Sequence, residues 1–306
     1  MASKNDGIKE CVTFLWNIEN FSYCWQNKKE RIWSPNFTSD CMEDTEWSLN
    51  LYPRGNRDEN YIAFYLQRHS SSKLDNLEIE CELAFLAEDG SVLEKAKGGK
   101  EAFDACDWFG SDTFAEREVV LKAKRDSFLP GDTLRAHCRI WMLDKKDLEN
   151  VQIFARTVIN VDHSFFVWDI GHFSTFQPEQ KFINRILSES AEIPITHILY
   201  LDCNPSGEEK ISINIRFDPD YLNYVRYFTF ETTLLDSEGN KWECGLMECM
   251  PWNKLESLSY TLPFTKKYLV DNKNAYLKDD VLSLNCRSII SSGIDYERFE
   301  IVNMCA

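Results

Sequence analysis

The clearest regularity along the chain is an alternation of apolar and polar residues at 77–85. Apolar side chains occupy every second position, and Glu78, Glu80 and Glu82 lie between them. A helix would scatter the apolar residues over all its sides, whereas a strand places them on one face and the carboxylates on the other. The segment is therefore predicted to be a β-strand whose buried face consists of Leu77, Ile79, Cys81, Leu83 and Phe85.

Similar patterns recur along the chain. Alternation is seen at 47–51, 133–142 and 211–217, and the apolar runs at 61–66 and 224–235 are typical of central strands. Most of the chain is therefore predicted to consist of strands.

The connections between these segments are short and rich in turn residues. Glu88-Asp-Gly90 and Ser237-Glu-Gly239 are typical of hairpin turns, and a further short strand is predicted at Glu118–Leu121. Strand following strand, with almost no helical periodicity, favours antiparallel β-sandwiches over a parallel α/β sheet. The predicted fold class is all-β.

The chain also repeats itself. Phe14–Ser22 reads F-L-W-N-I-E-N-F-S, and Phe166–Ser174 reads F-V-W-D-I-G-H-F-S. Further on, Leu134–Arg139 and Leu282–Arg287 share Leu, Cys and Arg in register, and the offset between the copies falls from 152 to 148 residues. Matches in the same order at a nearly constant offset indicate a tandem duplication of one β domain, not a solenoid.

The duplication predicts the domain organisation. A chain of 306 residues is long enough for two domains with their own cores. We expect a first domain at 8–146, a linker at 147–161, a second and more divergent domain at 162–294, and a C-terminal tail at 295–306.

Charge narrows the classes of partner. The formal net charge is −16, and acidic residues exceed basic ones by eight in each half of the chain. Nucleic acids and anionic membrane surfaces need a positive footprint, so neither is an expected partner, whereas neutral or basic peptides are acceptable. Met1–Gly7 is polar and no apolar run approaches about 18 residues, so an intracellular protein with eleven reduced cysteines is expected.

The sequence offers little that resembles catalytic or metal-binding chemistry. The five histidines are dispersed, no Cys-x-x-Cys occurs, and the nucleotide-binding and hydrolase motifs are absent. Cys106 and His137 could be read as a thiol and its base, but no third group orients them. No catalytic residue, metal or cofactor is predicted, and the protein is not expected to be an enzyme.

Aromatic residues are frequent in the irregular segments. The first half has Phe103, Trp108, Phe109 and Phe114 in such regions, and the second half has Trp242 and Trp252. Aromatic side chains beside a sheet can line a groove for an extended peptide, or they can close the ends of a sandwich core. The composition leaves both interpretations open.

Several spaced motifs of the first half resemble the MATH (meprin and TRAF homology) domain family, in particular the speckle-type POZ proteins and their arthropod relatives. The resemblance covers about 10–142, and 162–292 is a more divergent match without a clear Asp-Trp element. The motifs that carry it are Phe14-x-Trp-x-Ile-x-Asn-Phe-Ser22, Trp47-Ser-Leu, Tyr61-x-x-x-Tyr65-Leu, Ala87-Glu-Asp-Gly90, Asp107-Trp108 and Leu129-Pro-Gly-Asp-Thr-Leu134.

This resemblance implies two tandem TRAF-like antiparallel β-sandwiches that bind short, extended, Ser/Thr-rich peptide segments in a groove on one sheet. It further implies substrate recruitment to a cullin-3 ubiquitin ligase through a BTB/POZ domain, in the nucleus or the cytoplasm.

The resemblance also implies which residues contact the peptide. Tyr65 and Phe103 match groove aromatics of the family, and Asp107 and Trp108 match its Asp-Trp pair. In the second half, Ile215 stands at the position assigned to Tyr65, so that copy is expected to be a spacer or to bind something else.

The remaining positions of the predicted peptide-binding set depart from the family pattern. The family's Asp-Trp-Gly-Phe is Asp107–Gly110 here, with Phe109 and Gly110 interchanged, and the lysines that follow it are replaced by Ser111 and Asp112. Cys81 stands where the family has a pocket phenylalanine. A wider pocket with a more acidic rim, suited to a more basic peptide, is therefore expected.

Two functions follow from these observations. The first is a substrate-recognition adaptor that reaches a cullin-3 ligase through a BTB partner, for ubiquitination and proteasomal degradation. The second is a tandem-sandwich scaffold or decoy, because the sequence stops at Ala306 before a BTB domain, which is expected to be absent. A third class, deubiquitinases that carry this domain, would need a catalytic domain for which the two sandwiches leave no room.

Overall fold

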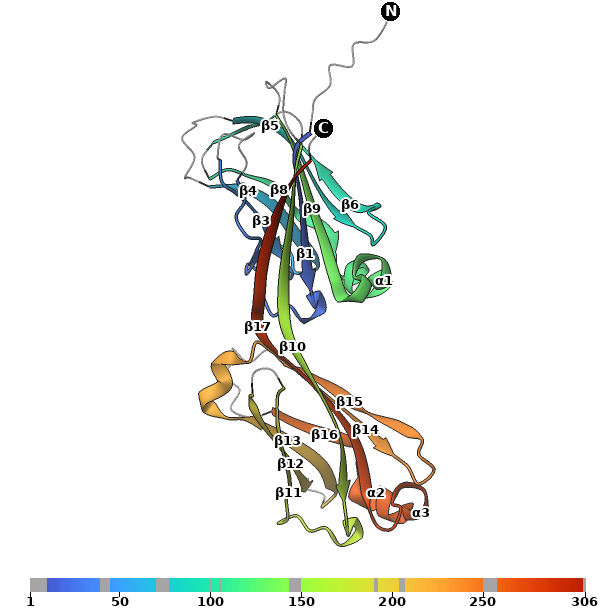
Figure 1. The fold of residues 1–306 in the computed structure, drawn as a ribbon. Helices are drawn as coiled ribbons and strands as arrows, with labels where there is room; N and C mark the ends of the chain where they lie inside the picture. The colour runs from blue at the N-terminus through green and yellow to red at the C-terminus, as the bar shows by residue number, and fades with distance from the viewer. Residues whose placement is uncertain are drawn as a thin grey trace, which may run out of the picture. The chain divides into compact units, whose positions relative to one another are not determined.

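The protein is built almost wholly from strands (Figure 1), in agreement with the all-β prediction. The structure is a computed structural model, and it describes residues 10–38, 45–69, 77–98, 101–104, 106–142, 150–189, 192–203, 207–249 and 258–304. The chain divides into two compact units. Unit 1 comprises Met1–Ile159 and Ile294–Ala306, and unit 2 comprises Asn160–Gly293.

Unit 1 is a sandwich of two sheets. The smaller sheet has the antiparallel strand order β2-β3-β4-β8, formed by Ile32–Trp33, Trp47–Tyr52, Tyr61–Arg68 and Trp108–Glu116. The larger sheet has the order β10-β1-β9-β5-β6, with β7 also paired to β5. Its strands are β1 (Glu10–Glu19), β5 (Leu77–Leu86), β6 (Val92–Lys97), β7 (Glu101–Phe103), β9 (Thr133–Met142) and β10 (Asn150–Ile170).

The core of unit 1 lies between these sheets. The alternation predicted at 77–85 is confirmed, because all five of its apolar side chains are buried on β5. The ring of Phe64 on β4 stacks against Phe85 on β5 with 5.4 Å between the centroids, so side chains of the two sheets interdigitate.

The segment expected to be a strand at Glu118–Leu121 is helical instead. Val119–Ala123 forms a π-helical turn (η3), followed by the short helix α1 (Arg125–Phe128) and the turn η4 (Pro130–Asp132). A short apolar run does not distinguish a strand from a helix by its periodicity, and here Val120 is the one residue of the turn that is buried.

Much of the predicted linker is a strand. Val151–Val158 of β10 pair in parallel with β1, in a register that places Phe14 opposite Ile153. Trp16 donates a buried hydrogen bond from Nε1 to Oγ1 of Thr157 over 2.9 Å, and Arg156 forms an ion pair with Glu19. These contacts make β10 part of the unit 1 sheet, and this parallel pair is an exception to the antiparallel pattern.

The predicted C-terminal tail also takes part in the fold. Strand β17 (Leu282–Met304) neighbours β10 in the strand order, and its residues from Ile294 onward belong to unit 1.

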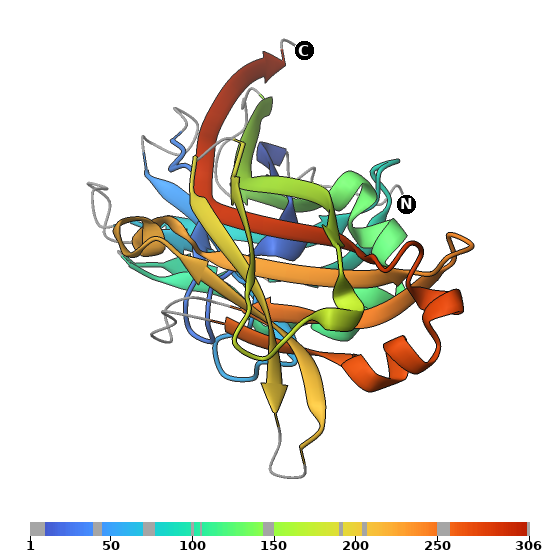
Figure 2. The ribbon, with the colours of Figure 1, turned by 90° about the horizontal axis from the view of Figure 1, so that it is seen from below.

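Unit 2 is also a sandwich. One sheet has the antiparallel order β11-β12-β13-β16, formed by Phe182–Leu187, Pro194–Cys203, Glu209–Phe217 and Leu258–Thr265. The other has the order β15-β14-β17-β10 and adds β14 (Tyr227–Leu235) and β15 (Lys241–Cys249). The turn η6 (Pro219–Tyr224) follows β13, and the helices α2 (Lys266–Asp271) and α3 (Lys273–Tyr276) lie at the margin of these strands (Figures 1 and 2).

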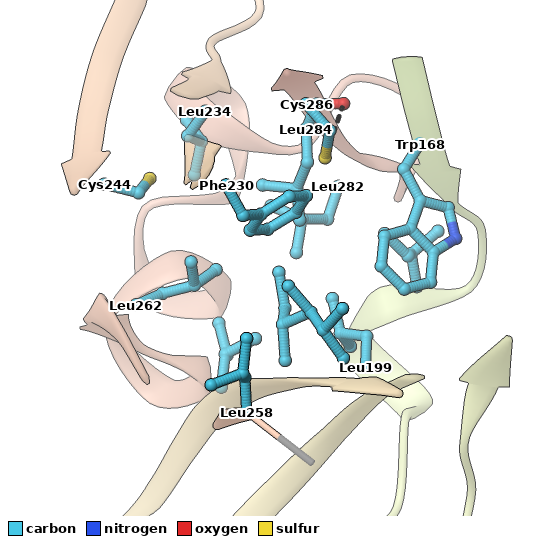
Figure 3. Close-up of a cluster of buried hydrophobic side chains, with 14 of the residues drawn as sticks. Trp168, Leu199, Phe230, Leu234, Cys244, Leu258, Leu262, Leu282, Leu284 and Cys286 are labelled. Atoms are coloured by element: carbon cyan, nitrogen blue, oxygen red, sulfur yellow. Dashed lines mark hydrogen bonds between the residues drawn. The ribbon is translucent and has the colours of Figure 1, made fainter. Parts of the chain in front are cut away.

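The core of unit 2 is drawn in Figure 3. Leucines of β12, β16 and β17 surround Phe230 of β14, with Trp168 of β10 at one side. Phe217 and Phe228, from the two sheets, meet edge to face with 4.9 Å between their centroids. The unit therefore has a core of its own.

The sequence repeat corresponds to a repeated structural corner. In unit 1, Asn20 has a left-handed backbone (φ 58°) and leads into the 3₁₀ turn η1 (Phe21–Tyr23). Ser22 donates to Asp132 from its backbone N over 3.3 Å and from Oγ over 2.8 Å, and Asp132 itself has φ 58°.

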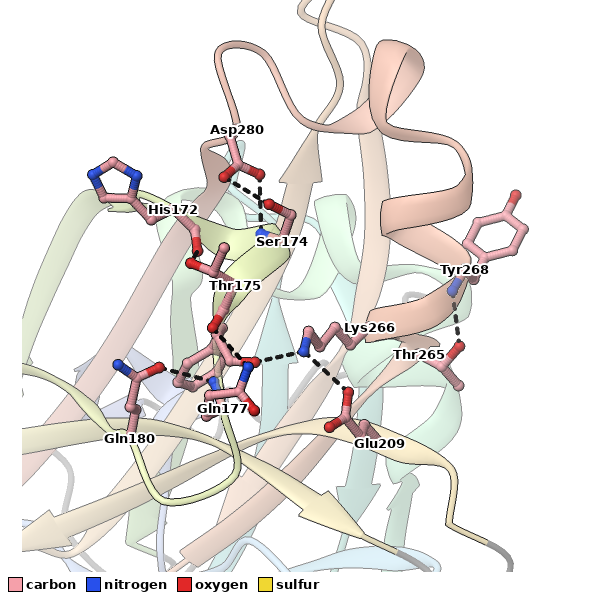
Figure 4. A network of polar contacts seen from close by, with 11 residues as sticks. His172, Ser174, Thr175, Gln177, Gln180, Glu209, Thr265, Lys266, Tyr268 and Asp280 are labelled. Atoms are coloured by element: carbon pink, nitrogen blue, oxygen red, sulfur yellow. Dashed lines mark hydrogen bonds and ion pairs between the residues drawn. The ribbon is translucent and has the colours of Figure 1, made fainter.

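Unit 2 repeats this corner (Figure 4). His172 has φ 55° and precedes η5 (Phe173–Thr175), and Ser174 donates from N and from Oγ, each over 2.9 Å, to Asp280. Asp280 has φ 60°. The Phe-Ser end of each repeated motif is thus held by an aspartate that precedes the closing strand of its unit.

One buried residue of unit 2 departs from the pattern of unit 1. Leu51 pairs with Ile32 in unit 1, and Leu199 pairs with Phe182 at the equivalent place in unit 2. Two residues earlier on each strand, His197 therefore occupies the core position that Leu49 has in unit 1. His197 is fully buried, and neither ring nitrogen has a hydrogen-bond partner in the described structure. Burial lowers the pKa of His197 from 6.5 to about 4, so the ring is neutral in the folded protein.

This histidine predicts a loss of stability in acid. Between pH 6.5 and 4 this histidine is protonated in the unfolded chain and neutral in the folded chain. The free energy of unfolding therefore falls as pH falls, by about 3 kcal/mol over this whole range. The substitution His197→Leu should remove this contribution and raise the free energy of unfolding at pH 7. Urea unfolding at pH 7 and pH 5 measures both effects.

The reciprocal change is the control. Leu49→His should introduce the same acid dependence into unit 1. If His197→Leu left the difference between pH 7 and pH 5 unchanged, the buried neutral ring would not be its source.

Candidate functional site

The candidate site lies on the outer face of the sheet β2-β3-β4-β8. Successive side chains of a strand point to opposite faces, so burying Leu49 and Leu51 turns Asn50 and Tyr52 outward. On β4, the same alternation turns Tyr65 outward. Strand pairing then aligns one outward row across the sheet, formed by Trp33, Asn50, Tyr65 and Gly110.

A hollow of about 270 Å³ lies on this face. Its walls come from β3, β4, β8 and the segments before β2 and after β3. The unit 1 hollow is lined by Arg31, Asn50, Tyr52, Asn56, Tyr65, Gln67 and Trp108.

Two aromatic rings form the apolar part of this hollow. Trp108 stands edge to face against Tyr65 with 4.8 Å between their centroids, and 57% of Trp108 is exposed. A large exposed indole beside a buried phenol is the kind of surface that anchors one apolar side chain of a ligand.

Gly110 makes this arrangement possible. A Cβ at Gly110 would lie 2.1 Å from the carbonyl oxygen of Phe64 and 2.5 Å from Cδ1 of Tyr65. The absent side chain lets β8 approach β4 closely at an irregularity in their register between Ile62 and Phe64, and it leaves the Tyr65 ring uncovered from that side.

Asp112 fixes the phenol end of the hollow. The hydroxyl of Tyr65 donates to Oδ1 of Asp112 over 2.5 Å, and Nδ2 of Asn56 donates to the same oxygen over 3.0 Å. Nε of Arg57 lies 2.9 Å from Oδ2. Burial, followed by the hydrogen bond to the Asp112 carboxylate, raises the pKa of Tyr65 far above its usual value of 10, so the phenol stays protonated.

The opposite side of the hollow is polar. The guanidinium of Arg31 lies 3.9 Å from the centroid of Trp33 and donates to the Tyr52 hydroxyl over 3.0 Å. Asn50 donates from Nδ2 to Oε1 of Gln67 over 2.9 Å, while its Oδ1 is buried without a hydrogen-bond partner among the described residues. Amide, hydroxyl and guanidinium groups of this kind can hydrogen-bond to a peptide backbone.

The structure brings part of the predicted site together. Tyr65 and Trp108 line the hollow, and Gly110 lies opposite Tyr65 on β8. Asp107 lies beside it, exposed, and its side chain caps the preceding turn by accepting from the backbone N of Asp104 over 2.8 Å.

Phe109 and Ser111 are on β8 but do not line the hollow. They pair with Leu66 and Phe64, whose side chains face the core. The ring of Phe109 packs over Gly98, and Oγ of Ser111 accepts from the backbone N of Thr113 over 3.1 Å.

Two predicted contacts lie elsewhere. Cys81 is buried on β5 of the opposite sheet, paired with Ile140, so it cannot widen a pocket on this face. Phe103 is buried on β7, with its ring edge to face against Trp47 at 5.5 Å. The alternation at 77–85 already placed Cys81 on the same strand face as the core residues Ile79 and Leu83. This pattern could have excluded Cys81 from a groove on the outer surface.

Sequence reasoning also missed several lining residues. Asn50, Tyr52 and Gln67 could have been found as the outward partners of alternating strands. Arg31 reaches the hollow only through the pairing of β2 with β3, for which the sequence carries no local signal.

The counterpart of Tyr65 in unit 2 is Asn214, not Ile215. The pairing of β12 and β13 places Asn214 opposite Ile198, as Tyr65 is opposite Asn50, and Ile215 is fully buried in the core. The prediction was one residue out of register, and in a strand one residue moves a side chain to the other face.

Comparison with protein families supports the resemblance seen in the sequence. Residues 13–140 match the MATH domain. The matched range runs from within β1 to within β9 and includes every residue that lines the hollow.

Two curated relatives share this part of the chain. TD and POZ domain-containing protein 1 of Mus musculus is 29% identical over 144 residues, which cover 45% of this chain and 38% of the relative. TD and POZ domain-containing protein 1-like, also of Mus musculus, is 28% identical over 140 residues, with the same coverage. The match thus spans well under half the length of these curated relatives.

A solved structure, the crystal structure of BuGH86wt in complex with neoagarooctaose, matches 84% of this chain and 34% of its own at 10% identity. Its TM-score of 0.13 is too low to indicate a shared fold.

Within the described residues, no helix has the length and hydropathy of a membrane span, and no three His, Cys, Asp or Glu side chains gather as a metal site.

The role of Gly110 can be tested by adding one methyl group. Gly110→Ala should lower the free energy of unfolding by about 1–3 kcal/mol, because the new Cβ overlaps the Phe64 carbonyl and β8 must move away from β4. Urea denaturation followed by tryptophan fluorescence measures the loss. Gly171→Ala, where an added Cβ meets no atom within 4 Å, is the matched control, and equal effects of both changes would contradict the close approach.

Proposed function

We propose that this protein is a protein-binding adaptor that holds a short, extended segment of a partner protein in the unit 1 hollow. The observation that carries the proposal is the exposed Trp108 ring standing over Tyr65 in a polar-lined hollow, within the residues that match the MATH domain. An apolar anchor beside hydrogen-bonding groups suits a peptide, which offers both a side chain and a backbone.

The charges of the hollow indicate the kind of peptide. Arg31 is its one charged lining residue, and the nearby Asp112 is already paired with Arg57. The hollow therefore offers a charged ligand one cation and no anionic lining residue. We propose a neutral, polar segment with one apolar residue against Trp108, in place of the more basic peptide expected from the sequence.

The hydrogen-bonding groups suit an extended chain. Oδ1 of Asn50 needs a donor, and the amide of Gln67 and the hydroxyl of Tyr52 lie on the neighbouring rows of the same face. Asn50 and Tyr52 lie two residues apart on β3, about 7 Å, which is also the repeat of an extended peptide that runs along the strand. Gln67 lies beside Asn50 on β4.

The proposal also includes a wider cellular role, which is inferred from the names of the relatives and from the family that the sequence resembles. The relatives are named for a POZ domain, and adaptors of the family that the sequence resembles recruit substrates to cullin-3 ubiquitin ligases. We propose that this protein likewise delivers substrates for ubiquitination through a POZ-containing partner, in the nucleus or cytoplasm, and performs no catalysis itself. Unit 2, which repeats the Ser–Asp corner, is proposed to be a second MATH-like domain.

A peptide screen tests the binding step. The full chain is applied to an array of 15-residue peptides, and binding of the best peptides is then measured in solution. Trp108→Ala should weaken binding by about 30-fold or more, since a central tryptophan commonly contributes about 2 kcal/mol or more to such an interface.

The control is Trp242→Ala, which removes a comparably exposed tryptophan from unit 2. This variant should bind within about twofold of the wild type. A screen without binders, or equal losses in both variants, would rule out the unit 1 hollow as the peptide site. Co-purification of cullin-3 with the wild type from cells, and its dependence on a POZ partner, tests the adaptor role separately.

A further inference from the structure

The outer face of the unit 2 sheet β11-β12-β13-β16 carries an unusual charge. Strand alternation turns three cationic side chains of β11 and β13 onto this face, and a fourth cation directly precedes β11, while the buried faces of the same strands supply the core. The four are Lys181, Arg185, Lys210 and Arg216, and all are exposed. They stand out in a chain whose net charge is −16.

These cations are not neutralised within the described structure. None of the four forms an ion pair with a described carboxylate, and Arg216 makes one hydrogen bond, from Nε to Oδ1 of Asn214 over 2.9 Å. On β12, Asp202 is the acidic residue that lies on the same face. It pairs with Lys210, at the end of the strands away from Arg185 and Arg216. The end of the face around Lys181, Arg185 and Arg216 therefore has a local excess of positive charge.

A hollow of about 140 Å³ lies among these residues. It is lined by Lys181, Ile198, Tyr200, Asn214 and Arg216, which we call the unit 2 hollow. Strand pairing makes it the counterpart of the unit 1 hollow. The row Asn50–Tyr65–Gly110 of unit 1 corresponds to the row Ile198–Asn214–Ser259 of unit 2.

The two hollows differ in chemistry. Tyr52 has a counterpart in Tyr200 and Arg31 has one in Lys181, but Gln67 is replaced by Arg216. The unit 2 hollow thus has two cations among its five lining residues, whereas the unit 1 hollow has one among seven.

Apolar side chains accompany the cations. Ile183 and Leu187 project from β11 with 55% and 62% of their surfaces exposed, and Arg185 lies between them on the same face. Ile198 forms the buried floor of the hollow next to Ile183. Exposed apolar residues alternating with a cation along a six-residue strand offer a surface to an extended chain that alternates apolar and acidic residues.

We infer that this face of unit 2 binds an acidic, extended segment of a partner protein, whose carboxylates meet Lys181, Arg185 and Arg216 and whose apolar side chains cover Ile183 and Ile198. The site is separate from the unit 1 hollow and does not depend on the function proposed for it. Charge complementarity selects the ligand, because the rest of the acidic surface repels the same segment and directs it to this face.

A polypeptide fits this face better than a nucleic acid. A nucleic acid extends beyond a short groove and would meet the acidic remainder of the protein, and Tyr200 is the one aromatic ring that lines the hollow for base stacking. A peptide of six to eight residues is confined to the strands that carry the cations.

The experiment uses the full chain and a fluorescein-labelled octapeptide that alternates glutamate with valine. Binding is followed by fluorescence anisotropy at two salt concentrations. The wild type should bind this peptide and not its lysine–valine counterpart, with an affinity that falls as salt rises. The double substitution Lys181→Glu with Arg216→Glu should weaken binding by at least about 30-fold.

The matched control is Lys241→Glu with Lys273→Glu, which changes the net charge of unit 2 by the same amount at exposed positions of β15 and α3. The affinity of this control for the peptide should stay within about threefold of the wild-type affinity.

Trp108→Ala should bind the acidic peptide normally, which separates this site from the unit 1 hollow. If the charge reversals disturb folding, Lys181→Gln with Arg216→Gln replaces them and should still weaken binding by about tenfold.

Three outcomes would overturn the inference. The first is that the glutamate peptide fails to bind the wild type or binds no better than the lysine peptide. The second is that the control pair weakens binding as much as the charge reversals do. The third is that a single-stranded DNA octamer binds this face more tightly than the peptide does, which would assign the face to nucleic acid.

Discussion

The pleat of the strands is the constraint on which the rest of this structure depends. Each strand must bury one face in a sandwich core, so its other face is set by register alone. In unit 1, burial of Phe64 and Leu66 in the core is what turns Tyr65 and Gln67 of β4 toward the outer face of the sheet. The candidate site is therefore the reverse side of the core, and a one-residue slip of β4 would remove both together.

The second element of the architecture is the repeated corner. In each unit a left-handed residue turns the chain into a 3₁₀ turn, and an aspartate with positive φ accepts two hydrogen bonds from a serine. For Asp132, burial raises the pKa although Ser22 and Arg125 act in the opposite direction. The same polar contact thus fixes where the first strand of each sandwich ends, and each core is built from that point.

The two units share a framework and differ in what their sheets display. Equivalent rows hold Tyr65 and Asn214, and the alternate rows hold core residues in both units. Because the core face and the outer face of a strand are independent, the outer face can change its chemistry without disturbing the packing. An aromatic hollow with one cation in unit 1 and a hollow with two cations in unit 2 follow from a few outward differences such as Gln67 and Arg216.

The sequence by itself determined the strands with strong alternation and the repeat of the opening motif, because these depend on local periodicity and on matching residues. The expectation that Tyr65 and Trp108 belong to one site came from the resemblance to a family. It did not determine the helical turn at Val119–Ala123, since a short apolar run has no distinguishing period. It also could not show that β10 pairs in parallel with β1.

Only the tertiary structure decided which side chains share the hollow. Arg31 arrives there through strand pairing across the sheet, and Asp112 approaches it to hold the Tyr65 hydroxyl. Cys81 and Phe103 are removed from it because their strands belong to the opposite sheet. The choice of Asn214 over Ile215 was likewise a matter of register. Spacing along a chain predicts which face a residue occupies within its own strand, but long-range hydrogen bonds decide which strand lies next to it.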